Sequence, residues 1–255
     1  MAKEICVVVS SRKSGSECDE FITMLKETCG TPAKFVFVTN DGLMGLSELY
    51  GSMLENTSID SDIMIFMHDD VVPLRHGWGK EVVRLFNKHR EYGIIGVAGS
   101  SEFNNECAWW RNKRIYGQLL HKNEKTGQSW LTAFSPLLDK DLQEVCVIDG
   151  LFMAVNRKKV SKNFDESLNY FDFYDIDFCL ANYLDGKCKI GVTTNLRFMH
   201  KSIGELSENW FTNREIIRKK YGKHFPISVE TKEEKIESND IGRTKKTDTS
   251  KTADV

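Results

Sequence analysis

The stretch SDIMIFMHDDVVP, from Ser61 to Pro73, determines how the rest of the chain is interpreted. Its residues 63–67 form an unbroken apolar run, which is typical of a strand buried on both faces of a sheet. The run ends in His68, Asp69 and Asp70. Ligands of open α/β sheets bind at the carboxyl ends of strands, where such side chains suit a hard cation beside a phosphate-bearing ligand. Solvated polar residues that merely close the strand are the alternative, and these three residues alone leave both interpretations open.

The composition is that of an ordinary globular protein. A chain of 255 residues can bury one large core or two small ones. The formal net charge of −2 provides no field that would attract nucleic acid. No apolar stretch is long enough to span a bilayer, and the N-terminal sequence does not read as a signal peptide. Seven cysteines without a CxxC pair argue against a zinc site or a disulfide framework, so we expect a reducing, cytoplasmic setting.

Strand-like and helix-like segments alternate along the first hundred residues. Apolar runs predict strands, and apolar side chains at helical spacing predict helices, at residues 4–10, 18–29, 34–38, 46–54, 63–67, 82–89 and 94–99. This alternation predicts an α/β fold with a mostly parallel sheet flanked by helices. Three polar strand ends, Ser10–Arg12, Thr39–Asp41 and His68–Asp70, would then meet on one edge and suit a nucleotide. The absence of GxGxxG and GxxxxGK[ST] motifs argues against a dinucleotide dehydrogenase or a P-loop NTPase.

Residues 100–147 have a different pattern, with short irregular strands and aromatic side chains among polar ones. These aromatic residues would suit a cleft that stacks sugars, or they pack a β-rich subdomain. Core packing is the favoured interpretation for Trp130 and Phe134. Neighbouring residues of a strand face opposite sides, so Trp109 and Trp110 cannot both face the same way, and one of them is a candidate ligand contact.

Two later segments place acidic residues where they need an explanation. Asp149 and Gly150 interrupt the apolar run 145–155, which reads as a strand. A buried unpaired carboxylate is costly, and a strand glycine often marks a close backbone approach, so this pair is a functional candidate. Asp175 and Asp177 lie in the first turn of a predicted helix, where capping and the helix dipole are the alternative explanation for the negative charge.

The remainder of the chain reads as a strand, a helix and a tail. Residues 189–200 are expected to form one strand that ends at His200, followed by a basic amphipathic helix. Residues 228–255 are rich in Lys, Glu, Asp, Thr and Ser and contain no aromatic residue, which is typical of a disordered tail. Basic residues on or after the last helix could touch anionic lipid, although a solvated helix face is the favoured interpretation: Arg214, Arg218, Lys219, Lys220 and Lys223.

Several segments together resemble one family. MHDDV, VIDGLFMAV, FDESL followed by FYDIDFCL, and FMHKSIG occur in the order seen in family 2-like glycosyltransferases of the GT-A fold. The resemblance covers roughly residues 4–222 and is closest to the branch in which a His replaces the first Asp of the DxD motif. It implies a GT-A domain over residues 1–227, with a nucleotide-binding sheet and a smaller β-rich acceptor part.

The resemblance also implies roles for individual residues. Asp70 matches the second acid of DxD, which holds Mn²⁺ or Mg²⁺ on the donor diphosphate, and His200 matches the histidine that completes the metal site. His68 takes the place of the first acid. Asp175 matches the catalytic base of inverting members, and Tyr174 stands where many members carry a Glu. The nucleotide-sugar side would consist of Ser10, Ser11, Arg12, Thr39, Asn40 and Asp69, and the acceptor side of Trp109, Trp110, Asp149, Gly150 and Tyr174.

The implied activity is transfer of a hexosyl or deoxyhexosyl group from a nucleotide diphosphate sugar, with a UDP-sugar expected, to a glycan or glycolipid. Such a reaction would invert the anomeric carbon, belong to polysaccharide biosynthesis and involve at most peripheral membrane contact. A GT-A-like protein that binds a nucleotide sugar or glycan without turnover is a second hypothesis. A nucleotidyltransferase is a third, but SSRKSGSE is a poor substitute for the Gly-rich, Arg-containing loop of such enzymes.

Overall fold

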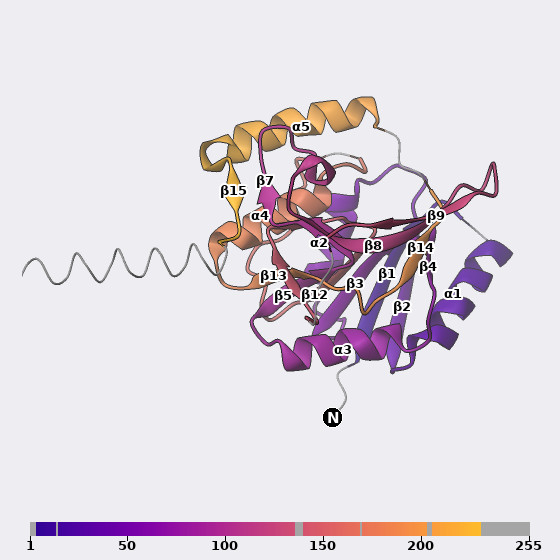
Figure 1. Cartoon of the computed structure of the whole chain (residues 1–255). Coiled ribbons are helices and arrows are strands. Elements are labelled where there is room, and N and C mark those ends of the chain that lie inside the picture. Colours follow the sequence, from indigo (N-terminus) through magenta and orange to yellow (C-terminus); the bar gives the residue numbers. More distant parts are fainter. Residues whose placement is uncertain (1–3, 14, 136–139, 169, 203–205, 231–255) are drawn as a thin grey trace, which may run out of the picture.

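The computed structural model describes residues 4–13, 15–135, 140–168, 170–202 and 206–230. A seven-stranded sheet forms its centre (Figure 1). In spatial order the strands are β10 (Gln143–Val145), β13 (Lys189–Val192), β5 (Tyr92–Gly96), β12 (Phe152–Asn156), β3 (Ile63–His68), β1 (Ile5–Ser11) and β2 (Ala33–Thr39). Strand β1 pairs in parallel with β2 and β3, and β13 does so with β5. Because β12 is antiparallel to both β3 and β5, only β12 and β10 run against the other strands, and the predicted mostly parallel sheet is confirmed.

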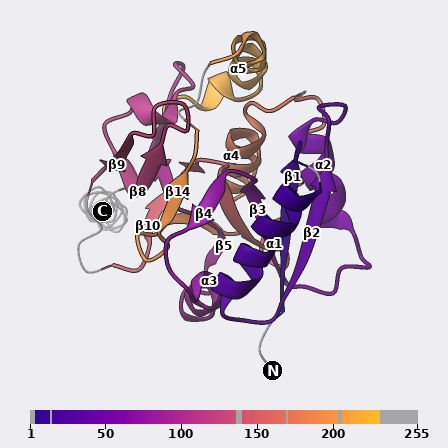
Figure 2. The same cartoon turned by 90° about the vertical axis from the view of Figure 1, so that its right-hand side faces the viewer.

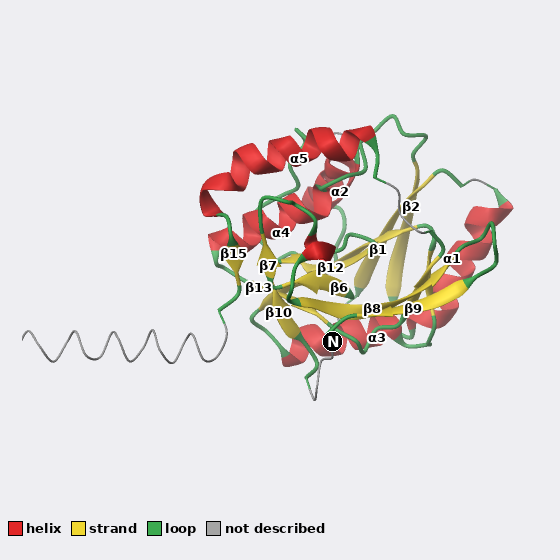
Figure 3. Cartoon of the chain, turned by 45° about the horizontal axis from the view of Figure 1, so that its top comes forward, coloured by secondary structure: helices red, strands yellow, loops and turns green. Residues whose placement is uncertain are grey.

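Helices cover both faces of this sheet. Alternate residues of β1 and β3 enter two separate cores, so Val8 and Phe66 pack on one face while Val7 and Ile65 pack on the other. Helices α1 (Ser16–Cys29) and α3 (Trp78–Lys88) cover one face (Figure 2), and α2 (Leu46–Glu55) and α4 (Tyr174–Asp185) cover the opposite face (Figure 3). Burial on both faces explains why the run 63–67 has no polar member.

A second, six-stranded sheet forms the β-rich part. Its path is β11 (Val147–Ile148), β6 (Ala98–Ser100), β8 (Ile115–Lys122), β14 (Phe198–His200) and β4 (Val71–Pro73), with β9 (Ser129–Ala133) paired to β8. Helix α5 (Glu208–Tyr221) lies over α4 at the top of Figure 1. The short helices η1 (Trp109–Arg111) and η2 (Gly222–His224) and the pair β7 (Glu102–Phe103) and β15 (Ile227–Ser228) complete the described elements.

Two segments were each predicted to form one strand, and both predictions are wrong because each segment is divided between the two sheets. The run 145–155 is divided among β10, β11 and β12, because β11 pairs with β6 in the second sheet while β12 joins the central one. Asp149 and Gly150 therefore lie in the crossing between two sheets and not inside a strand. Residues 189–200 likewise form β13 in the central sheet and β14 in the second sheet. Apolar character alone could not reveal that the chain changes sheets.

Two aromatic interpretations also need correction. Trp109 and Trp110 lie in the turn η1 and not on a strand, with Trp109 buried and Trp110 39% exposed. Trp130 is not a core residue, because it lies on the peripheral strand β9 and is 41% exposed. Phe134 is half-buried against the core, as expected.

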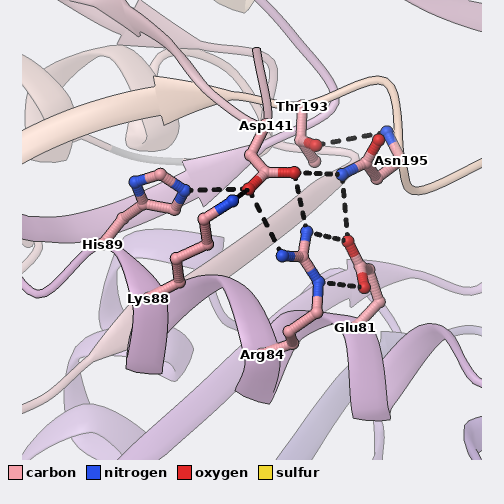
Figure 4. Close-up of polar contacts among 7 residues, drawn as sticks. All are labelled: Glu81, Arg84, Lys88, His89, Asp141, Thr193 and Asn195. Atoms are coloured by element: carbon pink, nitrogen blue, oxygen red, sulfur yellow. Dashed lines mark hydrogen bonds and ion pairs between the residues drawn. The ribbon is translucent and has the colours of Figure 1, made fainter. Parts of the chain in front are cut away.

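An ion-pair network ties α3 to the segment that leads into β14 (Figure 4). The Asp141 carboxylate accepts hydrogen bonds from Arg84, at 2.9 Å, and from Lys88, at 2.6 Å. His89 and Asn195 also contact it, each at 3.1 Å. These donors hold the pKa of Asp141 far below its usual range. The network thus anchors residue 195, five positions before His200, to helix α3, which covers one face of the central sheet.

All seven cysteines are free, and all except Cys18 are buried. Of the segment predicted as a tail, Ser228 belongs to β15 and Val229 is buried, whereas residues 231–255 lie outside the described part. No helix in the described ranges is long and apolar enough to cross a membrane.

Candidate active site

A cavity of about 640 Å³ opens where the central sheet meets the second sheet. Register explains its position, because Ser10 of β1 lies opposite His68 of β3 and Ser11 lies opposite Thr39 of β2. The three polar strand ends therefore meet on one edge, as predicted. Of the candidate residues, those that line the cavity are His68, Asp69, Asp70, Trp109, Trp110, Asp149, Gly150, Tyr174, Asp175 and His200.

His68, Asp70 and His200 form a cluster with the composition of a metal site. Each offers one ligand atom, and these atoms all lie within 4.8 Å of one another. His200 Nε2 is 3.3 Å from Asp70 Oδ2. The second sheet creates this contact, because β14 pairs with β4 and Lys201 N donates a hydrogen bond to the Asp70 carbonyl at 3.0 Å. Residues that are 130 positions apart in the sequence are thus brought together by one strand pairing.

The second carboxylate oxygen of Asp70 has no hydrogen-bond partner among the described residues, although it is buried. Burial alone would raise the pKa of Asp70, but the hydrogen bond and charge of His200 lower it to about 2, so the group is ionised at neutral pH. A buried anionic oxygen without a partner is costly. A divalent cation held by this oxygen and the two imidazoles would satisfy it, so the residues present fit such an ion.

Tyr174 orients one of these imidazoles. Its hydroxyl lies 2.8 Å from His68 Nε2 and thereby fixes the plane of the ring. Burial lowers the pKa of His68, which favours the neutral imidazole that a metal requires. The tyrosine occupies the position that the resemblance gives to a Glu, so in this chain the position supports the cluster of His68, Asp70 and His200.

Asp175 lies in the first turn of α4, on another wall of the cavity. Its two carboxylate oxygens accept hydrogen bonds from the backbone N–H groups of Gly150, at 2.7 Å, and Ile176, at 2.8 Å. Burial, followed by the charge of Asp149, raises the pKa of Asp175 to about 7. A carboxylate with a pKa near neutrality and a position in a cavity has the properties of a general base.

Gly150 is required for this arrangement. A Cβ atom at this position would lie 2.6 Å from Tyr174 Cζ and 2.8 Å from Asp175 Cβ, closer than real contacts allow. We expect Gly150→Ala to displace both side chains and to lower the free energy of unfolding by about 1–3 kcal/mol. Urea unfolding measurements test this. Gly222→Ala is the control, because no atom lies within 4 Å of a Cβ there, and an equal loss in both variants would contradict the prediction.

The residues predicted to bind the nucleotide adjoin the cavity but do not line it, apart from Asp69. Ser11 Oγ donates a hydrogen bond to the Asp69 carboxylate. Asn40 Nδ2 donates one to Ser10 Oγ at 3.2 Å, so these strand ends are coupled. Arg12 and Thr39 are exposed at the same edge.

Sequence reasoning missed several polar residues at this site, among them Ser202, whose hydroxyl lies 3.0 Å from His200 Nε2. His121, at the end of β8, lies beside His200 in parallel register and stacks on Trp130, with ring centroids 5.3 Å apart. Lys13 donates a hydrogen bond to the Asp69 carbonyl. Lys13 directly follows a polar strand end, which was a usable signal. The position of His121 depends on the pairing of β8 with β14, for which the sequence contains no signal.

Helix α5 holds the segment that carries Asp175 from both sides. On the N-terminal side of Asp175, Ser207 Oγ donates a hydrogen bond to the Asp172 carboxylate at 2.8 Å, and Asn213 Nδ2 donates one to the Asp172 carbonyl at 3.0 Å. On the C-terminal side of Asp175, Lys220 donates a hydrogen bond to the Asp177 carboxylate at 2.7 Å. Lys220 also bonds Asp165 at 2.6 Å, and the Tyr221 hydroxyl donates to Asp177 at 2.8 Å. The basic helix is therefore partly neutralised by contacts inside the protein.

Loss of the ion pair between Lys220 and Asp177 should destabilise the protein. Lys220→Met leaves the carboxylate of Asp177, whose side chain is 1% exposed, without its cation. We expect the free energy of unfolding at pH 7 to fall by about 2 kcal/mol, less than for a fully buried pair because Lys220 is partly exposed. Urea unfolding measures this. Lys219→Met, at an exposed neighbouring position, should change stability by less than about 0.5 kcal/mol. Equal stability of the Lys220→Met variant and the wild type would contradict the prediction.

Comparisons with known proteins give one family match. The family model described as "Glycosyltransferase like family" matches residues 4–221. Among curated proteins, the search found no match.

Similar solved structures include two glycosyltransferases. The catalytic domain of Drosophila beta1,4galactosyltransferase 7, in complex with xylobiose, is 12% identical with a TM-score of 0.47, covering 83% of this chain and 79% of that one. The mannosyltransferase PcManGT from Pyrobaculum calidifontis, in complex with GDP-Man and Mn²⁺, is 8% identical with a TM-score of 0.47, covering 84% of this chain and 61% of that one. At such TM-scores the likeness is too distant to assign a function. The family model, in contrast, spans nearly all of the described residues, and the chain therefore belongs to the glycosyltransferase-like family, with a mixed α/β domain of GT-A type.

Proposed function

We propose that this protein transfers a sugar from a nucleotide diphosphate sugar to an acceptor hydroxyl, in a reaction that requires a divalent cation and inverts the anomeric carbon. The observation that carries the proposal is the buried, unpartnered oxygen of Asp70 beside two imidazoles, in the cavity that also contains Asp175. A UDP-sugar is the first donor class to test.

In this proposal His68, Asp70 and His200 hold Mn²⁺ or Mg²⁺, with the imidazoles favouring Mn²⁺. When bound, the cation neutralises the negative charge that develops on the leaving diphosphate. The chain's own residues position the rest of the donor. Asp69, held by Ser11 and 3.8 Å from the Lys13 amine, lies at the nucleotide edge, where its carboxylate can accept a hydrogen bond from a ribose or sugar hydroxyl.

Asp175 acts as the general base. Its carboxylate takes the proton of the acceptor hydroxyl as the hydroxyl oxygen attacks the anomeric carbon from the side opposite the diphosphate. A single displacement of this kind inverts the configuration. The Gly150 and Ile176 N–H groups hold the carboxylate in place, and burial together with the charge of Asp149 keeps the pKa of Asp175 at about 7.

The pH dependence of transfer should report this base. Because only the carboxylate form of Asp175 accepts a proton, kcat/KM should rise with pH below an inflection near 7 and level off above it. Asp149→Asn removes a charge that raises this pKa and should move the inflection to lower pH. Initial rates between about pH 5.5 and pH 9 test both statements. A flat profile, or an inflection that Asp149→Asn leaves in place, would exclude Asp175 as the group observed.

A donor panel tests the function as a whole. Purified protein is incubated with nucleotide sugars, with and without Mn²⁺, while nucleoside diphosphate release and the melting temperature are followed. We expect one donor to stabilise the fold and to be slowly hydrolysed only when metal is present. Stabilisation by a donor that is never cleaved, with any acceptor, would instead support a nucleotide-sugar-binding protein without turnover. If no donor raised the melting temperature and none released nucleoside diphosphate, the proposal would be overturned.

A further inference from the structure

Large apolar side chains are exposed at the mouth of the cavity. Trp110, Phe171 and Leu206 all line it and are 39%, 54% and 49% exposed, respectively. Phe211 is also exposed and lies against Trp210, a further lining residue, with ring centroids 5.1 Å apart. Large exposed apolar side chains that gather around a cavity mark a surface that binds a ligand.

The apolar surface continues from this rim into the cavity. Trp109 and Phe134 line the inner part and contact each other, with ring centroids 5.8 Å apart. Trp110 connects them to the rim, because its ring lies 6.0 Å from Trp109 and 6.2 Å from Trp210. One side of the cavity is thus aromatic from inside to outside, and the ionisable side chains gather elsewhere in it. Phe171, whose ring lies 5.2 Å from the His68 ring, is the rim residue where the apolar surface meets these polar groups.

This division points to an amphiphilic acceptor, and the inference rests on the proposed transferase function. We propose that the acceptor is a sugar attached to an apolar chain, and that the chain lies along the aromatic side of the cavity while the sugar hydroxyl faces Asp175. A bare sugar would need hydrogen-bond partners around its ring. Phe171, Leu206 and Phe211 offer none from their side chains, so the rim suits hydrocarbon better.

A membrane surface is a less suitable occupant of the same residues. A flat bilayer could touch the rim but could not reach the buried Trp109. Attraction to anionic lipid also needs several unpaired basic side chains, and among the described basic residues of α5 only the exposed Lys219 has no ion pair. On α5, Lys220 pairs with Asp165 and Asp177, and Arg218 pairs with Glu215. Arg214 lies over the rings of Trp210 and Phe211, 5.4 Å from each centroid.

Binding of n-alkyl β-D-glucosides tests the aromatic side of the cavity without knowledge of the natural acceptor. Methyl, hexyl and octyl glucosides, below their micellar concentrations, are titrated into wild-type protein by calorimetry, in the presence of UDP and Mn²⁺ and again without them. We expect affinity to increase about fourfold for each added methylene that is buried. Phe171→Ala and Trp110→Ala should each flatten this dependence, whereas Leu184→Ala, at an exposed residue outside the cavity lining, should preserve it.

Equal affinity for the methyl and octyl compounds would overturn the inference. A chain-length dependence that survives both Phe171→Ala and Trp110→Ala would also overturn it, because the chain would then bind elsewhere. The titration does not require catalysis, so its failure is distinguishable from failure of the proposed function. Chain-dependent binding without donor cleavage would overturn the transferase and with it the acceptor assignment, leaving an amphiphile-binding cavity.

Discussion

Asp70→Asn is expected to lower metal-dependent turnover of the donor by about 10³-fold, which corresponds to about 4 kcal/mol of transition-state stabilisation. The substitution keeps the shape of the side chain but removes the charge that, in the proposal, binds the cation. The atom in the place of Asp70 Oδ1, which has no hydrogen-bond partner among the described residues, would then belong to a neutral amide. Release of nucleoside diphosphate in the presence of Mn²⁺ measures the loss, and the electron paramagnetic resonance signal of free Mn²⁺ measures binding.

Asp60→Asn provides the matched control, because Asp60 is exposed and lies outside the cavity lining. It should turn over and bind Mn²⁺ like the wild type. If Asp70→Asn also retained both properties, the cluster of His68, Asp70 and His200 could not be the metal site.

Asp175→Asn should reduce transfer by about 10²–10⁴-fold, the usual contribution of a general base, while the affinity for the donor changes less than about twofold. The carboxylate lies near the reacting hydroxyl in the proposal, but it does not touch the metal cluster. Product formation under saturating donor measures the first effect, and calorimetric titration of the nucleotide measures the second. Transfer that survives the substitution would show that another group accepts the proton.

The same variant has a stability signature that is independent of catalysis. A folded-state pKa of about 7 lies above the ordinary value of 3.8. The protonated carboxyl therefore stabilises the native state at low pH, and this contribution is lost as the pH rises between these two values. Asparagine does not titrate, so the stability of Asp175→Asn relative to wild type should increase by about 4 kcal/mol between pH 4 and pH 8. A difference in unfolding free energy between Asp175→Asn and wild type that stays constant with pH would contradict the raised pKa of Asp175.

Much of the fold could be predicted because local patterns and burial agree along the first hundred residues. The run 63–67 is buried on both faces, and the alternating helices cover the sheet as its pattern indicates. The pattern fails where the chain moves between sheets. Segments 145–155 and 189–200 are continuous in apolar character, but each contributes strands to both sheets, and pairing partners of this kind depend on contacts distant in the sequence.

The candidate site likewise contains residues whose positions could be predicted from the sequence and others whose positions could not. The polar ends of adjacent parallel strands were predictable as neighbours, because parallel strands present their carboxyl ends on one edge. The resemblance supplied His200 and Asp175, which no local pattern would have placed in the same cavity as Asp70. His121 and the α5 contacts to Asp172 and Asp177 were not predictable, since they depend on one strand pairing and on the packing of a helix.

If the cavity binds a nucleotide diphosphate through a metal ion, as we propose, titration of UDP into the wild-type protein should show metal-dependent binding. Two calorimetric titrations, one with Mn²⁺ and one with EDTA, need no acceptor and no turnover. We expect binding of one UDP per chain with Mn²⁺ and a loss of at least about a hundredfold in affinity with EDTA. Equal affinity in both titrations, or no binding of UDP or of GDP with Mn²⁺, would contradict it.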